Sequence, residues 1–466
     1  MGVPAHAGVP EGALPHRRPA PFPSPGASVS ETMAGVVRGC LRAVAVVLLG
    51  GLAAGVVGGG MVLLLHVVQA LAYGAHGPHL IDEIIGASPL RRVLAPTIGG
   101  VLAGLGWWGL RRRGPMVTLE KAIGSAPDQT APPGGGAPGP RSSLRVLPIT
   151  LDAMLQILVV GSGASIGREG APRQTAAVLA DLVRRRLGVD EPFGRIVLAA
   201  AAGAGLAAVY NVPTAGALFA LEVLLRTRAP RAVATAVAMS AIATVTAWPV
   251  VGREAVYAFA PAASPDLATL AWLLVAMPLA ALLGHGFDTL RDGATRRRPS
   301  PGWRLPVMIG SAGTVVGALS ILLPELPGNG KDIMQVAFAG QGGLLFLAVM
   351  VVLKPLATTL YIRAGAVGGL LTPALATGAA LGAAASLLVQ PSAGPADVAL
   401  WALVGAAGVL AVTQRAPFFA AAMAWELTRP PLWTVPVLVA VAYGAVILDR
   451  TARQRVLSGG RRVLRR

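Results

Sequence analysis

The sequence has little of what soluble and disulfide-rich proteins contain. Cys40 is the one cysteine among 466 residues, which excludes intramolecular disulfides and metal clusters built from cysteine. Charged residues make up only 13% of the chain, against about 25% in soluble domains. There is no HExxH pattern and no cluster of cysteine and histidine, so we predict no metal site. These absences argue against a soluble enzyme and a disulfide scaffold.

What the chain has in abundance is apolar sequence. Hydrophobic residues make up 54% and the mean hydropathy is +0.65, so we predict an all-α polytopic membrane protein. The first apolar run, about 36–73, exceeds the roughly 20 residues that cross a bilayer and predicts a tilted helix. Several later runs are short or interrupted by glycine and proline. That pattern is typical of transporters whose half-spanning helices meet at the membrane midplane.

The net charge of +18 comes from short basic runs between apolar segments. These runs are 111–113, 184–186, 296–298 and 450–466. The excess of arginine predicts that they are cytoplasmic, whereas 74–90 and 324–330, which lack Lys and Arg, face outside. No basic face is interleaved with aromatic residues, so we expect no nucleic-acid partner.

The composition divides the chain into a membrane domain and polar additions. We predict a disordered cytoplasmic tail at 1–34, a transmembrane domain at 35–449 and a basic cytoplasmic tail at 450–466. Residues 128–143 (DQTAPPGGGAPGPRSS) predict a flexible loop within the domain. The expected location is the cell membrane, multi-pass, with both termini in the cytoplasm.

One pattern occurs twice along the chain. The matched positions are 204–207 with 408–411, Pro213 with Pro417, and Glu222 with Glu426. Upstream, 167–172 (GREGAP) pairs with 368–373 (GGLLTP) in the same order. We therefore predict two homologous halves, about 36–227 and 266–448. Inverted repeats of this kind place a substrate site at the interface of the halves.

The two glycine-rich segments predict helix amino ends that face an anion. Aimed backbone N–H groups and positive helix ends bind an anion weakly enough to release it. The first candidate end lies at Gly167 and Gly170, and the second at Gly369, where the N–H groups of Leu370 and Leu371 would face the ion. The candidate partner is a small anion, with chloride the first choice.

Glu169 lies between Gly167 and Gly170. An ionisable residue at membrane depth costs about 2.5–3.5 kcal/mol to insert, so its presence there suggests a function. Ionised, it would compete with the anion as a tethered carboxylate; protonated, it would swing aside. Alternatively, Glu169 and Arg168 form a structural ion pair, or act on a lipid substrate in an intramembrane enzyme. The enzyme would need a nucleophile or metal in addition.

These residues resemble the CLC family of chloride channels and proton-coupled chloride antiporters. Residues 167–172 are similar to the family's GREGP element, whose glutamate is the external gate, and 369–373 to its GxFxP element, with Leu371 replacing phenylalanine. The segments 211–222 and 415–426 match the helices that follow each motif. The resemblance implies an all-helical inverted-repeat fold, a homodimer with one pore per subunit and no prosthetic group. It also implies anion transport in a bilayer, with protons as a second partner in an antiporter.

The sequence also departs from that family. The element that supplies a central serine corresponds to 114–120, which has none, and the central tyrosine corresponds to Pro431. We therefore expect the anion to rely more on backbone N–H groups, which leaves chloride, nitrate and fluoride open. The proton-relay glutamate of antiporters falls on Val223, so the chain is either a channel or uses a proton route through Glu222.

Overall fold

Long apolar helices dominate the computed structural model, which describes residues 29–75, 77, 80–112, 119, 123, 144–260 and 267–463. A bilayer offers no hydrogen-bond partners to the backbone, so a chain this apolar satisfies its peptide groups within helices. Apart from one isolated pair of bridged residues, the described residues contain no β-structure. The predicted all-α fold is confirmed.

The bounds of the described helices are as follows. They are α1 (Val29–Tyr73), α2 (Leu80–Gly86), α3 (Pro89–Arg112), α5 (Val146–Gly161), α6 (Gly170–Arg186), α7 (Glu191–Tyr210), α8 (Pro213–Leu218), the π-helix η1 (Phe219–Leu225), α9 (Pro230–Val251), α10 (Leu267–Arg296), α11 (Arg304–Leu319), α12 (Lys331–Phe338), α13 (Leu344–Ala364), α14 (Leu371–Val389), α15 (Pro395–Gln414), α16 (Pro417–Thr428) and α17 (Thr434–Val463).

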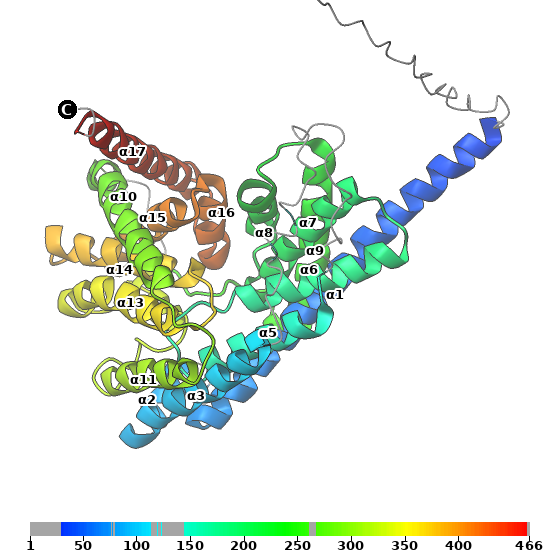
Figure 1. Cartoon of the computed structure of the whole chain (residues 1–466). Helices are drawn as coiled ribbons and strands as arrows, with labels where there is room; N and C mark the ends of the chain where they lie inside the picture. Colours follow the sequence, from blue (N-terminus) through cyan, green and yellow to red (C-terminus); the bar gives the residue numbers. More distant parts are fainter. Residues whose placement is uncertain are drawn as a thin grey trace, which may run out of the picture.

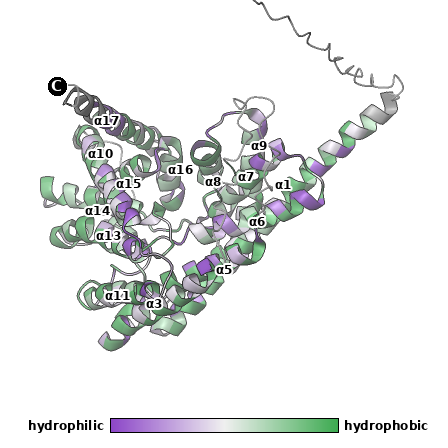
Figure 2. Cartoon of the chain, in the orientation of Figure 1, coloured by the Kyte–Doolittle hydropathy of each residue, from purple (hydrophilic) through white to green (hydrophobic). Residues whose placement is uncertain are grey.

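Full-length spans alternate with shorter helices. Within the described part of the chain, 9 helices are long and apolar enough to cross a membrane. Others are too short for the roughly 20 residues of a span, such as α5 with 16 residues and α16 with 12. The first helix, α1, has 45 residues and would be about 65 Å long, twice the hydrocarbon thickness. Most helices are apolar along their length (Figure 2).

Two predicted boundaries need correction. The predicted tail at 1–34 ends inside α1, which begins at Val29. The predicted tail at 450–466 is mostly a continuation of α17, which runs to Val463. In both places a helix continues into polar sequence, because arginine and alanine are good helix formers even where no apolar stripe exists. The predicted loop at 128–143 lies outside the described residues.

The two halves of the chain form two groups of helices. In Figure 1 the helices from α5 to α9 lie on the right beside α1, and α13 to α17 lie on the left with α10. Helix α11 is an exception, because it packs on α3 of the first half. Helices α14 and α15 approach so closely that a Cβ on Gly378 or Gly405 would overlap the other's carbonyl oxygen. Small residues permit such contacts between membrane helices.

The backbone repeats the same sequence of shapes in both halves. Helices α7 and α15 have 20 residues each. They end at Asn211 and Arg415, which adopt left-handed conformations with φ of 56° and 54°. A proline then begins the next helix in each half, at Pro213 and Pro417. The π-helical turn η1 makes the first of these helices one residue longer before its own left-handed end at Arg226.

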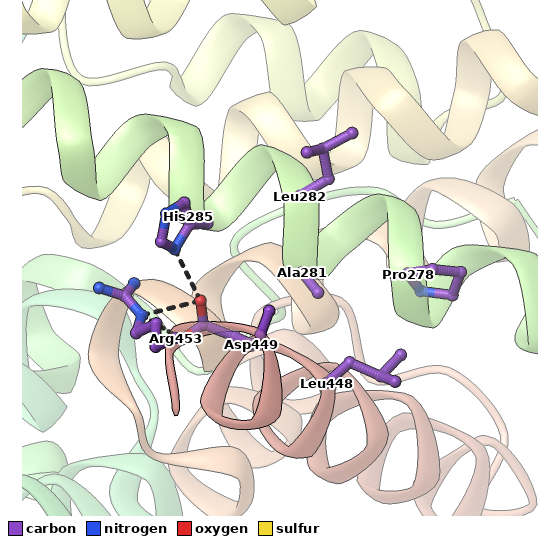
Figure 3. A pocket seen from close by; sticks show the side chains of 8 residues that line it. Pro278, Ala281, Leu282, His285, Leu448, Asp449 and Arg453 are labelled. Carbon is purple, nitrogen blue, oxygen red and sulfur yellow. Dashed lines mark hydrogen bonds and ion pairs between the residues drawn. The ribbon is translucent and has the colours of Figure 1, made fainter. Parts of the chain in front are cut away.

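The last helix is fastened to α10 by charged side chains. Asp449 of α17 lies 2.9 Å from Nδ1 of His285 on α10 and accepts from Nε of Arg453 at 2.8 Å (Figure 3). Arg453 also reaches Asp288 of α10 at 3.2 Å. These groups close one end of an apolar groove of about 550 Å³ between the two helices. The ion pairs satisfy one another, so we assign them a role in packing.

Candidate anion site

The two glycine-rich segments meet through their backbones. Gly167 N–H donates to the carbonyl of Gly369 at 2.8 Å, and Gly369 N–H donates to that of Gly167 at 2.7 Å. Gly167 precedes α6 and Gly369 precedes α14. The amino ends of one helix from each half are therefore brought to the same place, as the repeat predicts.

Glu169 is fully buried beside this pair of glycines. Its Oε1 accepts from the backbone N–H of Thr372 at 2.9 Å, from the Thr372 hydroxyl, and from the Tyr210 hydroxyl at 3.4 Å. Oε2 is buried and has no hydrogen-bond partner among the described residues. The carboxylate thus sits at the amino end of α14, where the helix dipole favours negative charge.

The glycines leave the space that the carboxylate occupies. A Cβ added to Gly167 or Gly369 would overlap Oε2 of Glu169. Gly170, the first residue of α6, lies against the side chain of Gln156, which a Cβ would also overlap. Any side chain at these positions would displace the side chain of Glu169 or of Gln156.

The second predicted helix end differs in detail from expectation. Leu370 is the residue before α14 and Leu371 is its first residue. The N–H group that meets Glu169 belongs to Thr372, one position further on. A residue at the second position of a helix has a free N–H, as do its two neighbours, so the prediction named the right turn but not this donor.

Arg168 does not pair with Glu169. Its guanidinium lies over the ring of Tyr210, 5.2 Å from the centroid, and no salt bridge joins it to Glu169 among the described residues. The structural ion pair considered from the sequence is therefore absent. Burial, and then the charge of Arg168, lower the pKa of Lys331 at the start of α12. Arg168 and Lys331 thus lie close enough for their charges to interact.

Lys354 is a buried charge that was not predicted from the sequence. This lysine lies within α13 and is fully buried. Its ammonium donates to the Ser165 hydroxyl at 2.8 Å and to the carbonyls of Leu326 and Gly328 at 3.1 and 2.8 Å. All three donors of the ammonium are therefore used. A lysine inside an apolar run was a visible signal, because charges in membrane helices are costly.

Glu222 and Glu426, the repeated glutamates, cap each other's helices. Glu222 accepts from the N–H groups of Phe419 at 2.8 Å and Phe418 at 3.4 Å, at the start of α16. Glu426 of α16 accepts from Thr214 and Ala215 at 2.9 and 2.8 Å, at the start of α8. We call this pair the glutamate clasp.

The structure describes one of the two positions at which the family has a hydroxyl donor and this chain has none. Pro431 is exposed in the connection between α16 and α17. Most of 114–120 lies outside the described residues. Val223 follows Glu222 in η1. Both residues line an open groove that Phe418 of α16 and Tyr443 of α17 also line.

Comparison with known proteins decides the family. The family model described as "Voltage gated chloride channel" matches residues 120–449. The chain belongs to the CLC family. It is 32% identical to a ClcB-like chloride channel protein of Ralstonia nicotianae over 381 residues, covering 78% of this chain and 84% of that protein. It is 28% identical to the voltage-gated ClC-type chloride channel ClcB of Citrobacter koseri, covering 80% and 88%.

Solved structures share the fold. A slow cyanobacterial Cl⁻/H⁺ antiporter superposes with a TM-score of 0.72 at 22% identity, covering 90% of this chain and 98% of that one. A CLC-type fluoride/proton antiporter superposes with a TM-score of 0.66 at 21% identity, covering 91% and 97%. Membership of this family makes the chain an anion transport protein in a membrane and not an enzyme. The fluoride alternative is not favoured, because the relatives that share more sequence are chloride channels.

Proposed function

We propose that this CLC protein carries chloride through a pathway that runs beside the paired Gly167 and Gly369, with Glu169 as its gate. The observation that carries the proposal is the position of the Glu169 carboxylate. It is buried and bound by Thr372 at the amino end of α14. A site that holds a carboxylate in this way offers a permeating anion the same donors and the same helix dipole.

Competition between the carboxylate and the anion would then control transport. Chloride enters when Glu169 leaves, and protonation of Glu169 favours its leaving because the neutral group loses its attraction to the helix end. Anion flux should therefore rise as the pH falls, whether the protein is a channel or an antiporter.

Glu222 is the candidate for the inner end of a proton route. It lines an open groove with Val223, and it is held by backbone N–H groups of α16. These bonds favour its ionised form, so a proton passing through Glu222 would weaken the clasp. Glu222→Gln should then abolish proton movement and leave anion flux intact if the route exists.

The assembly and orientation follow from the family and from charge. We propose a homodimer in the cell membrane with both termini in the cytoplasm. Two basic runs meet at the end of α13, where Arg111 donates to the carbonyl of Gly365 at 2.9 Å and Arg298 to that of Ile362 at 3.1 Å. Their common side is assigned to the cytoplasm by the positive-inside bias.

Reconstituted liposomes test the function. Chloride efflux and external pH are recorded together under an imposed chloride gradient, and uphill proton movement identifies an antiporter. Glu169→Gln should keep anion flux, and lose both proton coupling and activation by acid. Glu254→Gln is the matched control, because Glu254 is exposed in the connection after α9. Loss of chloride flux in Glu169→Gln, with the control unchanged, would contradict the assignment of Glu169 as a gate.

A further inference from the structure

The point at which Glu169 is held has two side-chain hydroxyls. One belongs to Thr372 at the start of α14, and the other to Tyr210 at the end of α7. Both residues are buried, with 0% and 1% of their surfaces exposed. Together with the Thr372 N–H, they direct three donors onto one oxygen atom. The sequence predicted instead that the anion would rely more on backbone N–H groups.

The neighbours of Tyr210 direct its proton inward. Asn329 Nδ2 donates to the Tyr210 hydroxyl oxygen at 3.4 Å. A phenol has one proton to donate, and with its oxygen accepting from Asn329 this proton points at Glu169. Arg168 lies over the face of the same ring and limits its movement.

We propose that Thr372 and Tyr210 are specificity-determining ligands of the transported anion, which takes their hydroxyl donors when Glu169 leaves. The inference rests on the proposed function, and it adds two side-chain hydroxyls to the backbone N–H groups. The three donors converge on one carboxylate oxygen, so a monatomic anion such as chloride that takes the place of this oxygen can accept from all three. Hydroxyl donors offset the loss of hydration, and they do so most for small, strongly hydrated anions.

The test uses an open site. In Glu169→Ala the carboxylate is gone, so chloride itself should occupy the donors, and its Kd is measured by calorimetry on the purified full-length protein in detergent. In this background Thr372→Val removes one hydroxyl at nearly constant volume. We expect chloride to bind about tenfold to a hundredfold more weakly, the range for one hydrogen bond to a charged group.

Further variants separate ligand loss from damage to the fold. Thr372→Ser keeps the hydroxyl and should restore binding to within a fewfold. Tyr210→Phe should weaken chloride binding less than Thr372→Val, because its contact with Glu169 is the longer one. Thr377→Val and Tyr361→Phe are matched controls, since the Thr377 hydroxyl bonds Pro373 of its own helix and the Tyr361 hydroxyl has no partner among the described residues.

The outcomes distinguish this inference from the proposed function. Weaker chloride binding in both hydroxyl variants, with a reduced preference for chloride over thiocyanate, supports it. A Kd and an anion preference within twofold of Glu169→Ala in both variants would overturn it, while chloride flux by the wild type would leave the proposed function standing. No chloride flux by the wild type and no binding to Glu169→Ala would overturn both.

Discussion

The glutamate clasp offers a test of how the halves of the protein are held together. Glu222 and Glu426 occupy equivalent positions and perform the same task on each other's helices. They differ in surroundings, because Glu426 is 7% exposed whereas Glu222 lines an open groove. Replacing each glutamate by glutamine therefore changes the same chemistry in two environments.

The hydrogen bonds set the expected sizes. Glu426 accepts two N–H bonds at 2.9 and 2.8 Å, and a hydrogen bond to a charged group contributes about 1.5–3 kcal/mol. Glutamine keeps one neutral oxygen and turns an NH₂ group towards the other donor, so we expect Glu426→Gln to lower the free energy of unfolding by about 3 kcal/mol. Glu222 has only one short bond and is open to solvent, so about 1 kcal/mol is expected for Glu222→Gln.

The assay is thermal unfolding in detergent, followed by tryptophan fluorescence at one scan rate because unfolding of such proteins is often irreversible. At roughly 2 °C per kcal/mol, Glu426→Gln should unfold about 6 °C lower than the wild type and Glu222→Gln about 2 °C lower. Glu254→Gln, at an exposed position after α9, serves as the surface control. Equal shifts, or a larger shift for Glu222→Gln, would refute the argument that burial sets the strength of each cap.

Two other perturbations have equally definite outcomes. Gly369→Ala should remove the activation of chloride flux by acid, because the added methyl group occupies the place of the Glu169 carboxylate; Gly109→Ala, with nothing within 4 Å of its Cβ, is the control, and retention of acid activation by Gly369→Ala would contradict the geometry. Burial, with help from Asp82, raises the pKa of Glu83 in α2 from 4.5 to about 7. The folded state therefore binds this proton more tightly than the unfolded state, so stability is lost as the pH rises from about 4.5 to about 7 and does not return above it. Glu83→Gln should accordingly gain thermal stability over the wild type at pH 8 but not at pH 4, and an equal difference at both pH values would exclude Glu83 as the cause.

Much of this architecture could be predicted from local sequence. Hydropathy identifies the helices because each span must be apolar over its own length. The meeting of 167–172 with 368–373 was also predictable, since glycine and proline mark helix starts and the repeat relates one half to the other. The structure pairs Gly167 with Gly369 in the way that this reasoning requires.

The two donors around Glu169 differ in this respect. Thr372 lies within the predicted segment 368–373, although the prediction named its neighbours Leu370 and Leu371 as donors. Tyr210 lies 41 positions from Glu169 outside both segments, and only the packing of α7 brings it there. The clasp was missed for the same reason, because a glutamate that caps a helix about two hundred residues away leaves no local pattern. Lys354 is different, because a lysine within an apolar run is unusual and can be recognised from hydropathy alone.

The two backbone hydrogen bonds between Gly167 and Gly369 limit how this protein can move. These bonds join the segment before α6 to the segment before α14, so moving one half away from the other would break both of them. In the mechanism proposed above, opening would therefore require the Glu169 side chain to rotate while the backbone around it stays in place. Such a motion involves few atoms, and its speed should depend on proton and halide concentration more than on the thickness or stiffness of the surrounding bilayer.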